Sequence, residues 1–167
     1  EKERSVGLGV MGFHSYLQQH SIPLESVMSK VWNKKIFKHI QEHVDQASKD
    51  LADERGACPD AADYGYNERF SNKTAIAPTA SISIICGGAS PGVEPVAANS
   101  YTHKTLSGSF NVRNRYLVEL LEKHGKNNDD VWSGITTNEG SVSHLDFLTD
   151  LEKDVFKTAF ELDQKWI

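Results

Sequence analysis

The sequence is poor in cysteine and has no long apolar run. Its 167 residues include two cysteines, Cys58 and Cys86, which are too few for a disulfide framework, so we expect a reducing, cytoplasmic setting. No stretch approaches the roughly 18 continuous apolar residues of a membrane span. No basic, then apolar, then small-residue signal segment opens the chain either. These absences argue against a secreted disulfide scaffold and against a membrane protein.

An excess of positive charge is also lacking. The chain has 18 Lys and Arg against 23 Asp and Glu, a formal net charge of −5, which argues against general binding to nucleic acid or to an anionic membrane. Its 38% hydrophobic and 25% charged residues are typical of a globular protein. The length suits one domain with a buried core.

A starting methionine and a closing turn are missing too. The chain starts "EKERSVG" and ends "LDQKWI" within a helical pattern. We therefore expect a piece of a longer protein, a partial domain over residues 1–167 that is incomplete at both ends. The sequence predicts only one or two strands, and a lone central strand cannot make a stable sheet by itself, which supports this expectation.

Helical periodicity dominates the first third of the chain. Apolar residues recur at helical spacing from Ser5 to Gln19, although each glycine there weakens a helix by about 1 kcal/mol, so Gly7, Gly9 and Gly12 predict close approach of another element. The strongest pattern runs from Glu25 to Arg55 and ends at Gly56. Its predicted core stripe consists of Val27, Val31, Ile36, Ile40, Val44, Ala47 and Leu51.

The remaining elements are shorter. Residues 57–72 have no period and predict a loop, and residues 73–78 predict a buried strand that Pro78 ends. We expect a short helix over residues 82–86, closed by glycines at 87 and 88, then a turn at residues 90–95. Further helices are predicted over residues 112–124 and from residue 129. The last begins at a Thr149–Glu152 capping box, with its core face at Leu151, Val155, Ala159 and Leu162.

The stretch "IAPTASISIICGGASPGVEP" at residues 76–95 carries the most chemistry. A strand that stops at a proline and turns into a helix leaves several backbone N–H groups unpaired, and these groups attract an anion, above all a phosphate. Thr79 and Ser81 add hydroxyl donors, and Ala80 allows close approach. The stretch contains no lysine, so it is not a Walker-type loop. The alternative is that Thr79 or Ser81 only caps the helix.

Several ordered segments resemble one family. The stretch above is similar to the substrate-phosphate loop of the ribonucleotide reductase large (alpha) subunit, where a P-T-[A/G]-S-like turn precedes a G-I-E-P-like turn. "RSVGLGVMGFHSYLQ" at residues 4–18, "LADERGACPD", "VEPVAANSYTHKTLSGSF" and "FKTAFELDQKWI" resemble the family in the same order. Essentially the whole chain is covered.

The resemblance implies a fold, a reaction and a site. The fold is the α/β class, predominantly helical in this fragment, as part of a ten-stranded α/β barrel. The activity is that of a ribonucleoside-diphosphate reductase that uses thiyl-radical chemistry to make deoxyribonucleotides. By position, Thr79, Ala80, Ser81 and Ile82 are the substrate-binding residues. They bind the diphosphate through the hydroxyls of Thr79 and Ser81 and the backbone N–H groups of residues 80–82.

The resemblance also implies what the chain lacks and needs. The family's radical cysteine and reducing cysteine pair have no match here, so we expect no catalytic residue, no cofactor and no metal in this chain, and no activity from the fragment alone. The implied partners are the remaining alpha-chain segments, a radical-generating beta subunit with its metal, thioredoxin or glutaredoxin as reductant, and ATP and dNTP effectors bound elsewhere. Cys58 and Cys86 are interpreted as packed thiols.

Three alternatives stay open. The sequence motifs of these segments resemble the aerobic class I enzymes more than the cobalamin-dependent class II enzymes. Both classes, however, share the P-T-x-S and G-x-E-P turns. The chain could also be a non-catalytic piece that completes a barrel supplied by a second polypeptide. Finally, "HIQEH" at residues 39–43 matches the H-x-x-E-H pattern of one zinc-peptidase group. His39 and His43 lie one helical turn apart and could share a metal, although no other segment of the sequence indicates a third ligand.

Other polar and aromatic residues have plainer interpretations. Glu94 is expected to serve a turn, and His103 and Lys104 are expected in a solvated loop rather than at a phosphate. The three tryptophans are expected to be packing residues: Trp32, Trp132 and Trp166.

Overall fold

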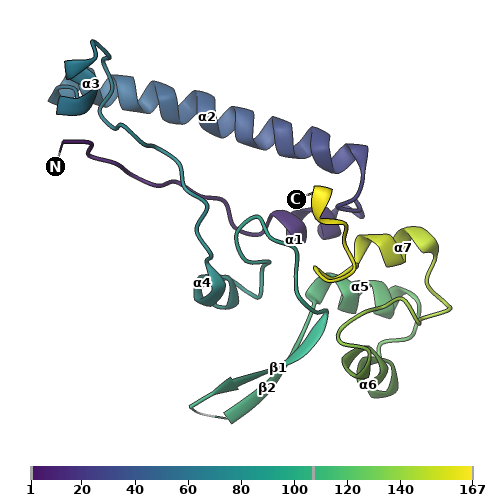
Figure 1. The fold of residues 1–167 in the computed structure, drawn as a ribbon. Helices are drawn as coiled ribbons and strands as arrows, with labels where there is room; N and C mark the ends of the chain where they lie inside the picture. The colour runs from purple at the N-terminus through teal and green to yellow at the C-terminus, as the bar shows by residue number, and fades with distance from the viewer. Residues whose placement is uncertain (1, 107, 167) are drawn as a thin grey trace. The chain divides into compact units, whose positions relative to one another are not determined.

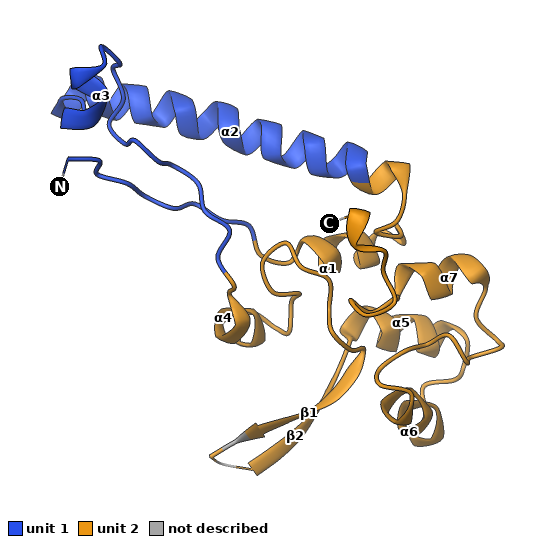
Figure 2. Ribbon diagram, viewed as in Figure 1, with its two compact units in different colours: residues 1–10, 30–77 blue, residues 11–29, 78–167 orange. Residues whose placement is uncertain are grey.

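The computed structural model describes residues 2–106 and 108–166, and Figure 1 shows the order of its helices and strands. The chain folds as two compact units, Glu1–Val10 with Lys30–Ala77 and Met11–Ser29 with Pro78–Ile167, coloured blue and orange in Figure 2. Among the described residues, no helix combines the length and the apolar character needed to cross a membrane.

Two extended segments of unit 1 lie side by side. The Val6 N–H donates to the Asn72 carbonyl at 2.9 Å, and the Leu8 N–H donates to the Lys73 carbonyl at 3.0 Å. Leu8 and Thr74 form a parallel bridge. The prediction of a helix from Ser5 is therefore wrong, since the helical spacing of the apolar residues does not outweigh the glycines between them. Helix α1 begins only at residue 13 and spans Phe13–Gln19.

The close approach predicted for Gly7, Gly9 and Gly12 is confirmed at Gly7 and Gly9. A Cβ added at Gly7 would lie 2.8 Å from the Ala75 Cβ, and one added at Gly9 would lie 2.6 Å from the Ala75 carbonyl oxygen. Both distances are shorter than side chains tolerate, so each position requires glycine. Gly12 instead has a positive φ of 85°.

This geometry predicts a selective rescue. Gly7→Ala and Gly9→Ala are each expected to lower the free energy of unfolding by about 1–3 kcal/mol, because both overpack the paired segments. Ala75→Gly should restore most of the loss in Gly7→Ala, where the clash is with the Ala75 side chain. The same change should not rescue Gly9→Ala, where the clash is with backbone. Urea unfolding of the single and double variants measures both outcomes, and equal rescue of the two would contradict the described pairing.

Helix α2 spans Val27–Arg55, as the sequence predicts, but the predicted core stripe is not buried. Val27 is 72% exposed and Val31 is 50% exposed, and Ala47 is also exposed. The side of α2 that is buried holds Ser48 and Ala52. The Ser48 hydroxyl accepts the N–H groups of residues 69 and 70 at 3.1 and 3.4 Å.

The part of unit 1 that follows α2, residues 57–77, differs from the prediction in two ways. Residues 57–72 contain the short helix α3, Pro59–Asp63, because Pro59 fits the first turn of a helix. The segment predicted as a buried strand is extended but exposed, and its Ile76 is 81% exposed. As predicted, α2 closes at Gly56, which has a φ of 79°.

A cluster of ion pairs joins the segment after α2 to α2 itself. The Lys73 ammonium lies 2.6 Å from an Asp45 carboxylate oxygen and 3.1 Å from a Glu68 oxygen. Burial alone would lower the Lys73 pKa, but the hydrogen bonds to Asp45 and Glu68 outweigh it and raise the pKa above its ordinary value.

Unit 2 holds the main core. Besides α1 it contains α4 (Ala80–Ile85), α5 (Arg115–Lys123), α6 (Asp129–Thr137), α7 (Asp150–Val155) and the 3₁₀ helix η1 (Gln164–Trp166). The start of α6 is predicted correctly, and Trp132 packs in the core as predicted. The core residues are Leu117, Leu121, Trp132, Ile135, Val142, Leu145, Leu148, Val155 and Phe156.

A β-hairpin replaces two predicted features. Strands β1 (Ser100–Thr105) and β2 (Gly108–Arg113) pair antiparallel, so His103 and Lys104 lie on a strand and not in a solvated loop. Helix α5 starts at Arg115 rather than Val112, because Asn114 caps it by accepting the Tyr116 N–H at 3.1 Å.

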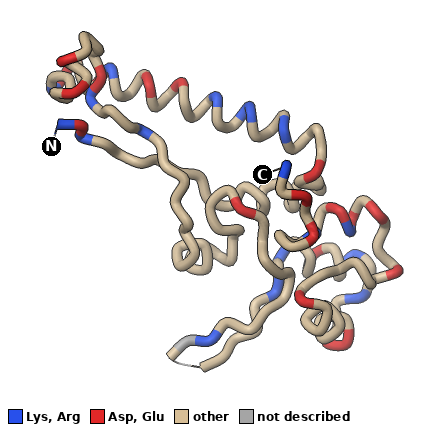
Figure 3. Tube along the Cα trace, viewed as in Figure 1, with Lys and Arg blue, Asp and Glu red and all other residues tan. Residues whose placement is uncertain are grey.

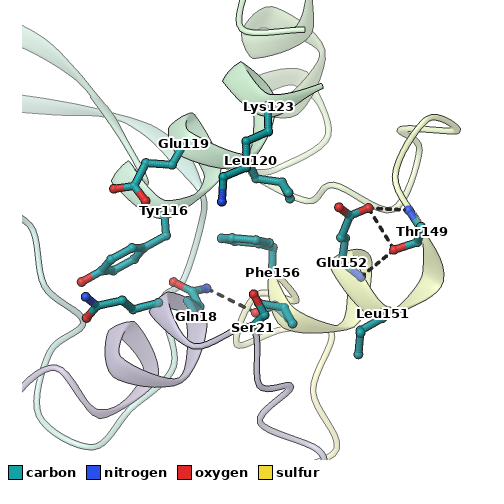
Figure 4. A pocket seen from close by; sticks show the side chains of 12 residues that line it. Gln18, Ser21, Tyr116, Glu119, Leu120, Lys123, Thr149, Leu151, Glu152 and Phe156 are labelled. Atoms are coloured by element: carbon teal, nitrogen blue, oxygen red, sulfur yellow. Dashed lines mark hydrogen bonds between the residues drawn. The ribbon is translucent and has the colours of Figure 1, made fainter. Parts of the chain in front are cut away.

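The capping box of α7 is confirmed. The Thr149 hydroxyl accepts the Glu152 N–H at 3.3 Å, and the Glu152 carboxylate accepts the Thr149 N–H at 2.8 Å. Figure 4 shows this box beside a cavity of about 300 Å³ whose wall includes residues of α5 and α7. The predicted length is wrong, since α7 ends at Val155. Leu151 is 57% exposed, while Leu162 is buried from a turn instead of a helix.

Candidate functional site

The chain turns into a short helix after Pro78, as predicted, but the helix spans Ala80–Ile85 and starts two residues before the predicted range of 82–86. Thr79 adopts a left-handed conformation, with φ 49° and ψ 22°, and α4 follows it directly. The Ser83 N–H donates to the Thr79 carbonyl at 2.9 Å. The N–H groups of residues 80–82 have no acceptor among the described residues, as expected for the first turn of a helix. Three backbone donors are therefore available at one place.

The Thr79 hydroxyl does not cap α4. It instead accepts the Gly92 N–H at 2.7 Å. This contact contradicts the capping alternative for Thr79 and leaves the single hydroxyl proton free to be donated to another acceptor. Ser81 is exposed, so its hydroxyl is accessible as well.

The four predicted substrate-binding residues are accessible, but they do not all face the same cavity. Thr79 is half-buried, whereas Ala80, Ser81 and Ile82 are exposed. Ala80 contributes to the wall of a cavity of about 390 Å³ in unit 2, together with Ser83 and Ile84 of α4. Thr79, Ser81 and Ile82 lie outside that wall.

The loop is free of formal charge. Residues 74–93 contain no Lys, Arg, Asp or Glu, and α4 is drawn without a charged residue in Figure 3. Among the described residues that line the cavity, only Arg113 is charged. Its guanidinium pairs with Asp129 at 3.0 Å and lies 5.0 Å from the centre of the Trp132 ring. An anion at this loop would therefore depend on N–H and hydroxyl donors.

The turn that follows α4 is confirmed. Gly87 and Gly88 end the helix with positive φ values of 80° and 72°. The Glu94 N–H donates to the Pro91 carbonyl at 3.0 Å, and the Glu94 side chain is exposed. The predicted turn role of Glu94 fits this geometry.

The two cysteines have different surroundings. Cys58 is fully buried and its sulfur lies 3.3 Å from the Ser71 hydroxyl. Cys86 terminates α4 and is exposed. The prediction of a packed thiol therefore holds for Cys58 and is wrong for Cys86.

The histidine pair on α2 does not form part of a larger ligand cluster. The His39 and His43 rings lie 4.0 Å apart between centroids, and the His43 Nδ1 lies 2.8 Å from the His39 carbonyl. Within the described residues, no group of three or more His, Cys, Asp or Glu side chains is placed to hold a metal ion. The third ligand required by the zinc-peptidase alternative is not provided there.

Comparisons with known proteins agree on one family. The family model described as "Ribonucleotide reductase, barrel domain" matches residues 1–68 and 61–167. The ribonucleoside-diphosphate reductase large subunit of Invertebrate iridescent virus 3 is 47% identical over 165 residues, which are 97% of this chain and 26% of that protein. A vitamin B12-dependent ribonucleoside-diphosphate reductase of Thermoplasma acidophilum is 31% identical over 98% of this chain and 22% of its own length.

A solved structure gives the same result. The class Id ribonucleotide reductase alpha subunit of Actinobacillus ureae matches with a TM-score of 0.84 and 41% identity, over 94% of this chain and 28% of that one. The chain thus spans about a quarter of the length of the proteins that it matches.

Proposed function

The chain belongs to the ribonucleotide reductase barrel-domain family, and on that premise we propose that it forms part of the large subunit of a class I ribonucleoside-diphosphate reductase. Such an enzyme reduces ribonucleoside diphosphates to deoxyribonucleoside diphosphates. Class I is favoured because the class Id alpha subunit and the viral large subunit share more sequence with the chain than the vitamin B12-dependent relative does.

Within that enzyme, we propose that Thr79, Ala80, Ser81 and Ile82 bind the substrate diphosphate. The observation that carries this assignment is the first turn of α4, where three N–H groups have no acceptor among the described residues. Hydroxyls of Thr79 and Ser81 lie in the same turn. Because the loop lacks formal charge, phosphate binding here relies on the oriented dipoles of backbone N–H and hydroxyl groups, as at other helix N-termini.

The radical chemistry is assigned to other segments. Cys58 is buried against Ser71, and neither it nor Cys86 stands in the sequence context of the family's radical cysteine. We propose that the rest of the alpha chain supplies that cysteine and the reducing pair. A beta subunit with a metal-dependent radical, thioredoxin or glutaredoxin, and ATP and dNTP effectors complete the system. The two free thiols are compatible with the cytoplasm.

The loop assignment predicts a specific kinetic change. In the complete large subunit, Ser81→Ala should raise the KM for a ribonucleoside diphosphate about tenfold and leave kcat within about twofold, since the phosphate contact is made in the ground and transition states alike. Steady-state kinetics with the beta subunit and reductant measure both constants. Ser109→Ala is the matched control, because Ser109 is an exposed serine on β2. A KM that stays at the wild-type value in Ser81→Ala would remove the assignment.

The vitamin B12-dependent relative supports one second candidate. If the chain belongs to a class II enzyme, adenosylcobalamin alone should sustain turnover by the complete large subunit, with no beta subunit added. A class I enzyme requires the beta subunit and does not respond to the cobalamin. Turnover assays with each addition distinguish the two.

A further inference from the structure

Three buried polar side chains join the start of α1 to the segment that follows α4. Ser90 is 0% exposed, His14 is 1% exposed and Ser15 is 6% exposed. Burying polar groups is unfavourable unless they are hydrogen-bonded. Each of these three side chains bonds to backbone far away in the sequence, and Figure 1 shows the segment after α4 turning back beside α1.

Ser15 and Ser90 exchange a reciprocal pair of hydrogen bonds. The Ser15 N–H donates to the Ser90 Oγ at 3.1 Å, and the Ser90 N–H donates to the Ser15 Oγ at 2.8 Å. The Ser90 carbonyl also accepts the Gly12 N–H at 2.9 Å. Gly12 is the N-cap of α1 and has no side chain to satisfy these donors. Ser90 therefore supplies the cap of α1 from another part of the chain.

A second contact holds the same segment further on. The Val96 N–H donates to the His14 Nδ1 at 3.1 Å. Gly92 lies between these two attachment points, and its carbonyl accepts the Gly12 N–H at 3.1 Å. The segment from Ser90 to Val96 is thus fixed against α1 at three positions.

This segment reaches the candidate phosphate loop through one hydrogen bond. The Gly92 N–H donates to the Thr79 Oγ1 at 2.7 Å. Thr79 has a φ of 49°, which a β-branched residue adopts only when its surroundings impose it. Fixing Gly92 therefore helps to hold Thr79 in this conformation, and with it the direction of the free N–H groups that follow.

We propose that Ser15 and Ser90 are positioning residues of the substrate-phosphate loop. They attach the Ser90–Gly92 turn to α1, and the turn in turn holds Thr79 in the left-handed conformation that presents the donors of α4. The proposal rests on the assignment of that loop to the substrate diphosphate.

The test compares Ser90→Ala with a matched buried serine in the complete large subunit. Ser90→Ala should raise the KM for a ribonucleoside diphosphate about fivefold to tenfold, with kcat within about twofold, because a loosened loop binds phosphate less well in ground and transition states alike. Ser48→Ala is the control, since Ser48 is also 0% exposed and its hydroxyl also accepts backbone N–H groups. It should lower the melting temperature without changing KM.

A binding measurement separates loop shape from general stability. Affinity for the diphosphate should fall in Ser90→Ala, whereas affinity for the corresponding nucleoside, which lacks phosphates, should stay at the wild-type value. Ser15→Ala should give the same pattern, a lower affinity for the diphosphate and a wild-type affinity for the nucleoside. It replaces Ser90→Ala in the comparison if the latter does not fold.

The outcomes distinguish this inference from the loop assignment. If Ser81→Ala raises KM while Ser90→Ala and Ser15→Ala behave like Ser48→Ala, the positioning role is overturned and the loop assignment stands. If all of these variants keep the wild-type KM, the loop assignment fails and the positioning role fails with it.

Discussion

Replacing Asn99 by leucine is expected to lower the free energy of unfolding by about 3 kcal/mol, because the change removes three hydrogen bonds of one buried side chain at once. The Asn99 amide nitrogen donates to the Gly140 carbonyl at 3.0 Å and to the Phe156 carbonyl at 2.7 Å. Its amide oxygen accepts the Asn114 side chain at 2.9 Å. Asn99 is 1% exposed, so water does not replace these bonds.

The position of Asn99 explains why so much depends on it. One side chain ties the residue before β1 to the segment after α6, the end of α7 and the cap of α5. Leucine has a similar volume but no polar group, so the Phe156 carbonyl loses its side-chain donor. The Gly140 carbonyl keeps only the backbone N–H of residue 99, and the Asn114 amide keeps only the Gln18 Oε1. Partial unfolding of the C-terminal half of unit 2 should follow.

Equilibrium urea unfolding monitored by tryptophan fluorescence measures this effect, since Trp132 lies in the same core. Asn111→Leu is the matched control, because Asn111 is exposed on β2 and should change stability by less than about 0.5 kcal/mol. A loss below about 1 kcal/mol in Asn99→Leu would contradict the role assigned to this amide.

Lowering the pH from 6.5 to 4 is expected to remove about 3 kcal/mol of stability through His14 alone, since a pKa difference of one corresponds to about 1.4 kcal/mol. Burial lowers the pKa of His14 from 6.5 to about 4. The folded chain therefore keeps His14 neutral in this range while the unfolded chain takes up a proton. Stability is complete above pH 6.5 and falls as the pH drops towards 4.

A comparison with His14→Asn isolates this contribution from that of the carboxylates. The Asn Oδ1 can replace the Nδ1 that accepts the Val96 N–H, but the amide does not titrate. The variant should be less stable than the wild type at pH 7, because it loses ring packing, and the difference should shrink as the pH falls. A difference that stays constant from pH 7 to pH 4 would show that His14 is protonated in the folded chain or accessible to water.

Local patterns in the sequence predicted local structure well. The capping box at Thr149 and Glu152, the start of α6 at Asp129 and the end of α2 at Gly56 depend on residues within a few positions of one another. The turn into α4 is of the same kind, since a proline followed by small hydroxyl residues restricts the backbone within one turn. For that reason the sequence predicts the turn into a short helix after Pro78, although α4 begins at Ala80 instead of Ile82.

Pairing between distant segments was not predicted. The hairpin was missed because β2 is exposed at five of its six residues and shows no alternation of apolar and polar residues. The spacing at residues 5–10 predicts a helix instead of the extended segment, because nothing in this stretch indicates its partner at residues 72–75. The Ser15–Ser90 contact joins residues 75 positions apart, and neither serine carries a local signal.

The difference in accessibility between the two thiols allows a fluorescent label to be placed beside the candidate loop. Cys86 is accessible at the end of α4, whereas Cys58 is enclosed, so a maleimide dye should modify this chain at one position without engineered cysteines. A fluorophore placed there sits one helix away from Thr79. Its emission would report changes in the loop directly, and titration with a ribonucleoside diphosphate could be followed optically, without turnover.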